Sequence, residues 1–130
     1  MLQGASIPVA TEAKPTPILF TDEDLRERYF GSYDGGCTDS YALVWADDAK
    51  DVNTIPPGDG ESVFQVAQRV KRFVTKVEAH YSDHNIVVVS HGDALSILAA
   101  AMLGTDLRGH RQHGLPNCGW LRIGCKGSTV

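Results

Sequence analysis

One stretch decides the fold of this chain: Ile86-Val87-Val88-Val89-Ser90-His91-Gly92-Asp93. Its four consecutive β-branched residues predict a buried strand that ends just before His91. Apolar residues then recur at helical spacing as far as Gly104, a typical helix-ending residue. They are Leu95, Ile97, Leu98, Ala101 and Met102. The stretch therefore predicts a strand, a turn and a helix, with His91 at the carboxyl end of the strand, where open α/β sheets bind ligands.

This arrangement favours phosphate binding near His91. The start of the predicted helix presents unpaired backbone N–H groups and the positive end of the helix dipole, and the imidazole lies beside them. A histidine that closes a strand also has a simpler interpretation, because it can merely cap the strand. The other histidines are less suggestive. His110 and His113 lie in a basic segment that is typical of a solvated loop, and His80 and His84 flank a polar connection.

The composition predicts one soluble domain. A chain of 130 residues that is 42% hydrophobic has the size and the apolar content of a single domain. The net charge of -4 argues against nucleic-acid binding, and no apolar run reaches the length of a membrane span. Cys37, Cys118 and Cys125 show no metal-ligand spacing and predict reduced thiols in a cytoplasmic protein. We expect neither a metal nor a cofactor.

Other segments also have recognisable patterns. Ser62 and Gln65 fit a capping box that begins a helix. One face of that helix is apolar, with Val63, Ala67, Val70, Phe73 or Val74, and Val77, and the other is polar, with Gln68, Arg69, Lys71, Arg72 and Lys76. Residues 21–28 predict a short helical turn and residues 41–45 a short apolar helix. Residues 17–20 and 119–123 predict short strands.

Four segments together resemble the histidine phosphatase superfamily, the group that contains cofactor-dependent phosphoglycerate mutases and related phosphatases. Its acid-bearing segment is similar to Leu25-Arg26-Glu27-Arg28-Tyr29-Phe30-Gly31 followed by Asp34-Gly35. Its helix-starting motif is similar to Pro57-Gly58-Asp59-Gly60-Glu61-Ser62, and its second-histidine motif to Val89-Ser90-His91-Gly92-Asp93. The entrance to its last core strand is similar to Leu115-Pro116-Asn117-Cys118. The order and the separations of these segments agree with the family.

The resemblance implies roles for four residues. Glu27 would be the catalytic proton donor to the leaving oxygen, and Arg28 would contact the substrate anion. His91 would give a hydrogen bond or positive charge to the phosphoryl group, and Gly92 would bring its backbone N–H to the same oxygens. Simpler interpretations stay open, because Glu27 could be a surface carboxylate. Arg28 could pair with one of three acidic neighbours, Asp22, Asp24 or Asp34.

One motif of the family is missing from this sequence. The family's nucleophilic histidine lies in an Arg-His-Gly motif on the first strand, and no such tripeptide occurs here. Arg111-Gln112-His113-Gly114 has an extra residue and follows the second-histidine motif, so we do not assign the nucleophile to it. The helix that follows the first strand in the family is missing too. Residues 1–130 thus resemble the family's C-terminal two-thirds, a single, N-terminally incomplete domain.

Three interpretations of function follow. The first is a phosphoglycerate mutase-like histidine phosphatase whose complete form hydrolyses a phosphomonoester through a phosphohistidine, with little or no turnover by this chain. The second is a non-catalytic family member that binds an anion or a partner. The third is a structural fragment that another chain completes. The sequence leaves open whether this chain is an enzyme.

The resemblance implies an α/β fold, a three-layer sandwich around a mainly parallel sheet, without its first strand and following helix. Loss of that strand would expose an apolar sheet edge, so we expect marginal stability or self-association into a homo-oligomer. The expected partner is a small phosphorylated metabolite or other phosphomonoester, and neither nucleic acid nor a membrane.

Overall fold

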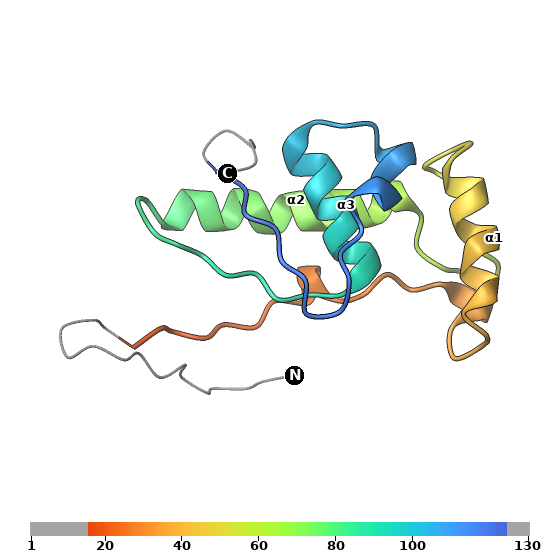
Figure 1. Ribbon diagram of the computed structural model, residues 1–130, viewed down its shortest axis with the longest axis horizontal. Helices are drawn as coiled ribbons and strands as arrows, with labels where there is room; N and C mark the ends of the chain where they lie inside the picture. Colours follow the sequence, from red (N-terminus) through yellow and green to blue (C-terminus); the bar gives the residue numbers. More distant parts are fainter. Residues whose placement is uncertain (1–15, 125–130) are drawn as a thin grey trace.

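The computed structural model describes residues 16–124, and the regular elements assigned there are helices. The α-helices are α1 (Asp39–Asp48), α2 (Val63–His80) and α3 (Gly92–Leu103). Short 3-10 helices are η1 (Glu23–Leu25), η2 (Gly31–Tyr33) and η3 (Leu107–His113). Helix α3 crosses α2 and η3 packs against α3, while α1 stands beside the N-terminal end of α2 (Figure 1). None of the described helices is long and apolar enough to cross a membrane.

The predicted α/β sandwich is wrong for the part of the chain that the structure describes. Residues 16–124 contain no β-strand, and Ile123 alone is assigned as an isolated bridge. Residues 17–20, 86–89 and 119–123, which were predicted to be strands, have no such assignment. A β-branched sequence favours an extended backbone, but a sheet also needs neighbouring strands. Residues 86–89 make no backbone hydrogen bond to another described residue, so they belong to no sheet within residues 16–124.

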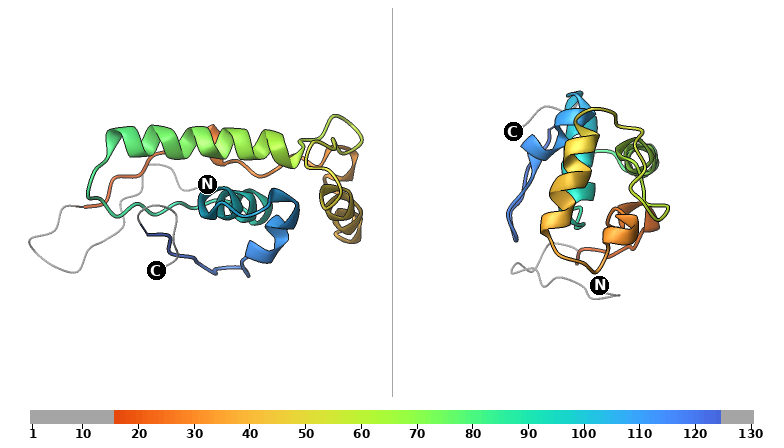
Figure 2. Two further views of the ribbon diagram at one scale, coloured as in Figure 1. Left: turned by 90° about the horizontal axis from the view of Figure 1, so that it is seen from above. Right: turned by 90° about the vertical axis from the view of Figure 1, so that its right-hand side faces the viewer.

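The hydrophobic core lies between α2 and α3. Figure 2 shows the arrangement of these two helices from two further directions. Its buried residues are Val63, Val66, Ala67, Val70, Ile97 and Leu98. The predicted capping box of α2 is confirmed, because the Ser62 N–H donates to Gln65 Oε1 at 2.8 Å and Ser62 Oγ accepts from the Gln65 N–H at 3.2 Å. Each buried valine, isoleucine or leucine side chain of this core stabilises the fold by about 1.5 to 3 kcal/mol.

The helix predicted after His91 is also confirmed. It is α3, and it ends at Gly104, whose φ of 70° places it in the left-handed region that favours glycine. The short helix predicted over residues 41–45 is part of α1, and the helical turn predicted over residues 21–28 contains η1. The sequence predicts α1, α3 and η1 because the residue patterns that favour them are local in the chain.

Two motif segments pack directly against each other at Gly31. The Ser32 N–H donates to the carbonyl oxygen of Pro57 at 2.7 Å, and the Glu61 N–H donates to the carbonyl oxygen of Tyr29 at 2.7 Å. Gly31 has a φ of 64°, and a Cβ atom there would lie 2.1 Å from the Pro57 oxygen. Only glycine fits this contact. The contact fixes the segment that carries Glu27 and Arg28 beside the start of α2.

Candidate functional site

The carboxylate of Glu27 lies on the N-terminus of α3. Its Oε1 accepts hydrogen bonds from the Ala94 N–H at 3.0 Å and from the Arg28 N–H at 2.8 Å. Its Oε2 accepts from the Asp93 N–H at 3.3 Å. Helix N-termini attract anions because their first N–H groups lack partners within the helix. The structure therefore gives Glu27 specific partners and brings it to the same helix end as His91 and Gly92.

His91 and Gly92 form the exposed start of α3. His91 is the N-cap residue, with an extended backbone, and its side chain makes no capping hydrogen bond to the helix. The backbone at Gly92 is open to solvent, and a Cβ atom built there would meet no atom within 4 Å. Both residues are thus accessible to a ligand that approaches the helix end.

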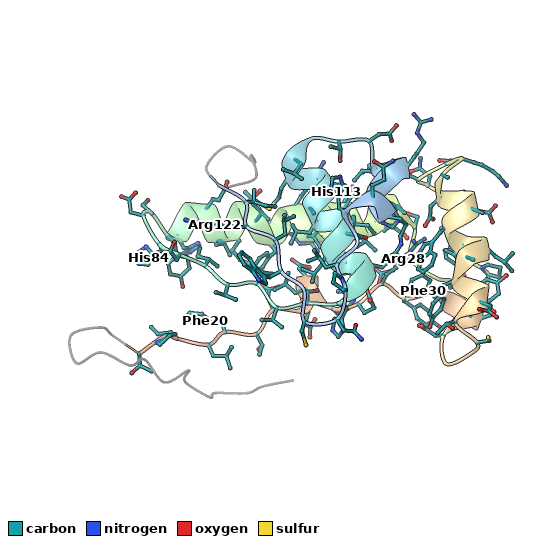
Figure 3. The ribbon with its side chains drawn as sticks, viewed as in Figure 1. Phe20, Arg28, Phe30, His84, His113 and Arg122 are labelled. Atoms are coloured by element: carbon teal, nitrogen blue, oxygen red, sulfur yellow. The ribbon has the colours of Figure 1, made fainter. Side chains whose placement is uncertain are left out.

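Arg28 lies deep in the molecule, between α1 and the start of α3 (Figure 3). Its guanidinium donates to both carboxylate oxygens of Asp48 at 2.7 and 2.9 Å, and to Asp93 Oδ2 at 3.1 Å. Its Nε donates to the carbonyl oxygen of Glu61 at 2.8 Å. These partners differ from the three acidic neighbours considered from the sequence. Most donors of Arg28 are therefore committed inside the protein.

The ion pair keeps Arg28 and Asp48 charged despite their burial. Burial lowers the pKa of Arg28, but the hydrogen bonds and charges of Asp48 and Asp93 outweigh it, so that this pKa lies above its ordinary value. Burial raises the pKa of Asp48, and the hydrogen bonds and charge of Arg28, together with the nearby His110, lower it further than burial raises it. Asp48 is therefore an ionised carboxylate at neutral pH.

Asp93 connects three elements at the start of α3. In addition to Arg28, its carboxylate accepts from the Trp45 Nε1–H at 3.1 Å and from an Arg111 N–H at 3.0 Å. The Arg111 guanidinium also stacks 4.0 Å from the centre of the Trp45 ring. These contacts hold α1 and η3 against α3, and they use the positive charge of Arg111 within the protein.

Arg69 was predicted on the polar outer face of α2, and that placement is wrong. Its side chain is 4% exposed and donates to Glu61 Oε2 at 2.8 Å. It also donates to three backbone carbonyl oxygens, those of Asp24, Arg26 and Glu27, at 2.7, 2.8 and 3.2 Å. A guanidinium can satisfy several acceptors at once, so Arg69 holds the backbone that leads to Glu27. Helical periodicity gives no sign of these acceptors.

His110, predicted in a solvated loop, is completely buried in η3. Its Nδ1 lies 2.9 Å from Ser96 Oγ, and its Nε2 lies 3.5 Å from Asp48 Oδ2 without a full hydrogen bond. One signal in the sequence pointed to such a partner. Ser96 interrupts the apolar face of the predicted helix, and a buried hydroxyl needs a hydrogen-bonding neighbour.

Asp48, Asp93 and His110 are a candidate metal-ligand set, because each offers one ligand atom and these atoms lie within 4.8 Å of one another. The residues do not fit a cation well. Arg28 donates to both carboxylates from a single nitrogen atom, so its positive charge already occupies the space between them. A metal ion would have to displace a buried guanidinium.

Comparison with known proteins identifies relatives. The family model described as histidine phosphatase superfamily (branch 1) matches residues 8–130. The adenosylcobalamin/alpha-ribazole phosphatase of Salmonella typhimurium is 31% identical over 103 residues, which are 79% of this chain and 48% of that protein. The chain therefore spans about half the length of this curated relative.

Two solved structures are similar in fold. One is described as mycobacterial hydrolase 1, with a TM-score of 0.62, 24% identity, and coverage of 80% of this chain and 56% of that one. The other is a mycobacterial glucosyl-3-phosphoglycerate phosphatase, with a TM-score of 0.52, 27% identity, and coverage of 70% and 48%. The path of the chain is thus similar to that of larger proteins.

Proposed function

Because the chain belongs to branch 1 of the histidine phosphatase superfamily, we propose that the N-terminus of α3 is the phosphoryl-binding half of a phosphatase site. One observation supports this most strongly. In the first turn of α3, the N–H groups of Asp93 and Ala94 donate to the Glu27 carboxylate, close to the exposed N-cap residue His91. Carboxylate and phosphoryl oxygens are both anionic acceptors, so the same donors suit a phosphomonoester.

Each residue has a role in the proposed site. His91 donates a hydrogen bond to the phosphoryl oxygens, and the Gly92 N–H approaches them because no side chain intervenes. Glu27, in its protonated form, gives a proton to the leaving oxygen as the P–O bond breaks. To do so it leaves the N–H groups of α3, which then become available to the phosphoryl group.

We propose a positioning role for Arg28 rather than a contact with the substrate. A contact with the substrate anion, which the resemblance implies, would require Arg28 to break its hydrogen bonds to Asp48 and Asp93. In the proposed role it holds Asp93, the second residue of α3, and so orients the N–H groups that receive the anion. Arg111 is held by the same carboxylate.

The proposed substrate is a small phosphorylated metabolite or other phosphomonoester, because the similar proteins named above include phosphatases. In its complete form the protein would hydrolyse this substrate through a phosphohistidine. The sequence of this chain contains no Arg-His-Gly nucleophile motif. We therefore propose that the chain itself has little or no turnover. We also propose a cytoplasmic location, since Cys37 and Cys118 are exposed free thiols, a state that a reducing compartment maintains.

The second candidate function is non-catalytic anion binding. Its support is that Arg28 and Arg111 both neutralise Asp93, so that little positive charge is left for a phosphoryl transition state. A structural fragment that another chain completes is the third candidate. The observation that favours it is the exposure of residues 86, 87 and 89, which another chain could cover.

Hydrolysis of an aryl phosphate and binding of inorganic phosphate test these functions together. We would compare the wild-type chain with His91→Ala and with His80→Ala, which removes an exposed histidine from the far end of α2. We expect the 31P resonance of inorganic phosphate to broaden when the wild type or His80→Ala is added, because both bind phosphate. We expect no broadening when His91→Ala is added. Hydrolysis lost only in His91→Ala would show a working catalytic site. Absence of both binding and hydrolysis in the wild type would overturn the proposal.

A further inference from the structure

Arg111 differs from the other arginines around the start of α3 in how few of its donors have partners. A guanidinium carries five N–H donors. Arg69 makes five hydrogen bonds to other residues. Arg28 makes four. Within residues 16–124, the Arg111 side chain makes a single one, to Asp93 Oδ1 at 3.0 Å. Most of the Arg111 donors therefore have no partner in this part of the chain.

Trp45 and Asp93 hold the Arg111 guanidinium in a defined place. Its carbon atom lies 4.0 Å from the centre of the Trp45 ring, so the ring covers one face of the cation. The Trp45 Nε1–H donates to the same oxygen of Asp93 that accepts from Arg111. Helix η3, which carries Arg111, lies between α3 and α1 (Figures 1 and 2). A cation that is already ordered loses less conformational freedom when it binds an anion.

Asp93 does not depend on Arg111 as its only cation. Its other carboxylate oxygen, Oδ2, accepts from Arg28 at 3.1 Å. If Arg111 turned toward an anion, Asp93 would still be paired, whereas Arg28 could not turn away without leaving the buried carboxylate of Asp48 unpaired. The Arg111 side chain is also 40% exposed, and that of Arg28 is 0% exposed. Arg111 is therefore the arginine that Asp93 can share with a ligand.

We propose that Arg111 contacts the phosphoryl group at the N-terminus of α3, an inference that rests on the function proposed above. Its partner Asp93 is the second residue of α3 and directly follows Gly92. Only the Asp93 side chain thus lies between the guanidinium and the N–H groups of the first turn. The remaining N–H groups of Arg111 donate to the phosphoryl oxygens together with His91, since a planar guanidinium matches the geometry of phosphate. The anion contact that the resemblance implies for Arg28 belongs instead to Arg111.

Titration with inorganic phosphate at constant ionic strength, followed by broadening of the 31P resonance, tests this contact. Arg111→Gln should raise the dissociation constant roughly tenfold, because a charge-assisted contact is lost. Arg111→Lys should give an intermediate value, since it keeps the charge but loses the planar set of donors. The matched control is Arg108→Gln in the same 3-10 helix, because Arg108 pairs with Asp106 at the surface. It should bind phosphate like the wild type, and far-UV circular dichroism checks that all variants are folded.

A double-variant comparison separates a direct contact from an effect through Asp93. Removal of Arg111 also takes a positive charge away from Asp93, and the less neutralised carboxylate would itself repel phosphate. Asp93→Asn removes that negative charge. A direct contact predicts that Arg111→Gln weakens phosphate binding by a similar factor in the Asp93→Asn background. An Arg111→Gln substitution without effect in that background would show that Arg111 only neutralises Asp93, and the contact would be wrong.

The fluorescence of Trp45 gives a second readout that needs no change at Asp93. The chain has two tryptophans, so Trp120→Phe leaves Trp45 as the only one. Because Arg111 lies over the Trp45 ring, phosphate bound to Arg111 should change the Trp45 emission. The change should saturate with the same dissociation constant as the 31P titration. It should be absent in Trp120→Phe/Arg111→Gln.

The results distinguish failure of this inference from failure of the proposed function. Phosphate binding that is lost in His91→Ala but unchanged in Arg111→Gln would keep the phosphoryl site and overturn the role of Arg111. A constant Trp45 emission while the 31P titration shows binding would also exclude that role. Absence of phosphate binding by the wild type would overturn both the site and the role of Arg111.

Discussion

The guanidinium of Arg28 meets the carboxylate of Asp48 through two hydrogen bonds of 2.7 and 2.9 Å, and both side chains are shielded from solvent. This pair joins the segment before η2 to the C-terminal end of α1. The nitrogen that bonds Asp48 Oδ2 also bonds Asp93, so the pair reaches the start of α3. Glu27 precedes Arg28 directly, and its position on α3 therefore depends on this buried contact.

Arg28→Met should destabilise the protein by about 3 to 5 kcal/mol, because it leaves the buried carboxylate of Asp48 without its cation and leaves Asp93 with Arg111 alone. Urea unfolding followed by circular dichroism measures the loss. Arg108→Met is the control, since Arg108 pairs with Asp106 at the surface, where an ion pair contributes little. An Arg28→Met protein as stable as the wild type would show that the buried pair does not stabilise the fold.

The sequence predicts α2 and α3 because burial on one helix face is a local, periodic property. It could not predict the partners of Arg28, since Asp48 and Asp93 are 20 and 65 residues away along the chain. Their proximity depends on how α1 and α3 pack. The same reason explains Arg69, whose three carbonyl acceptors lie in a segment more than 40 residues earlier.

Acid should destabilise the protein through Asp48 and Glu61. Burial raises the pKa of each, but Arg28 and Arg69 respectively lower it further, so that each folded pKa lies below its ordinary value of 3.8 or 4.5. The stability that these carboxylates contribute is therefore present above their unfolded pKa and is lost as pH falls through the folded pKa. We expect the free energy of unfolding to fall steadily below about pH 4.5.

Asp48→Asn should make this acid dependence shallower while lowering stability at neutral pH. Its neighbour Asp47 is exposed, so Asp47→Asn should keep the wild-type profile. Urea unfolding at a series of pH values gives the three curves. If Asp48→Asn lost stability toward acid as steeply as the wild type, Asp48 would not be a source of the pH dependence.

His110→Ala should cost about 2 to 4 kcal/mol, since it opens a cavity and removes the buried imidazole that lies against Ser96 Oγ and Asp48. His113→Ala is a matched comparison in the same 3-10 helix. His113 is only half-buried and contacts Thr105 Oγ1, so its removal should cost less. Thermal unfolding of both variants measures the difference. Equal losses would mean that the burial of His110 gives it no special part in stability.

The sheet was the largest error of prediction from the sequence. Four β-branched residues favour an extended backbone at residues 86–89, but a sheet depends on other segments that lie far away in the chain. His91 was located correctly at the start of a helix, because the change from the valine run to helical spacing is local. The part of the site that depends on neighbouring segments, Glu27 on the N–H groups of α3, required the structure.

Substitutions of Gly92 and Gly104, at the two ends of α3, distinguish an effect on phosphate binding from an effect on stability. Both have open space where a Cβ atom would lie, but only Gly104 has a positive φ, of 70°. Gly92→Ala should therefore change the free energy of unfolding by no more than about 0.5 kcal/mol, whereas Gly104→Ala should cost about 1 kcal/mol. Chemical unfolding of the two variants tests this contrast.

For phosphate binding, Gly92→Ala should have a larger effect than Gly104→Ala, the reverse of their effects on stability. If the Gly92 N–H approaches the phosphoryl oxygens, the methyl group of Gly92→Ala blocks that approach and weakens binding of inorganic phosphate by roughly tenfold, the effect of one lost charge-assisted hydrogen bond. Folded Gly104→Ala should bind phosphate like the wild type, because Gly104 lies at the opposite end of α3. Titration followed by 31P resonance broadening gives both affinities. Wild-type affinity in Gly92→Ala would place the anion elsewhere than on this N–H group.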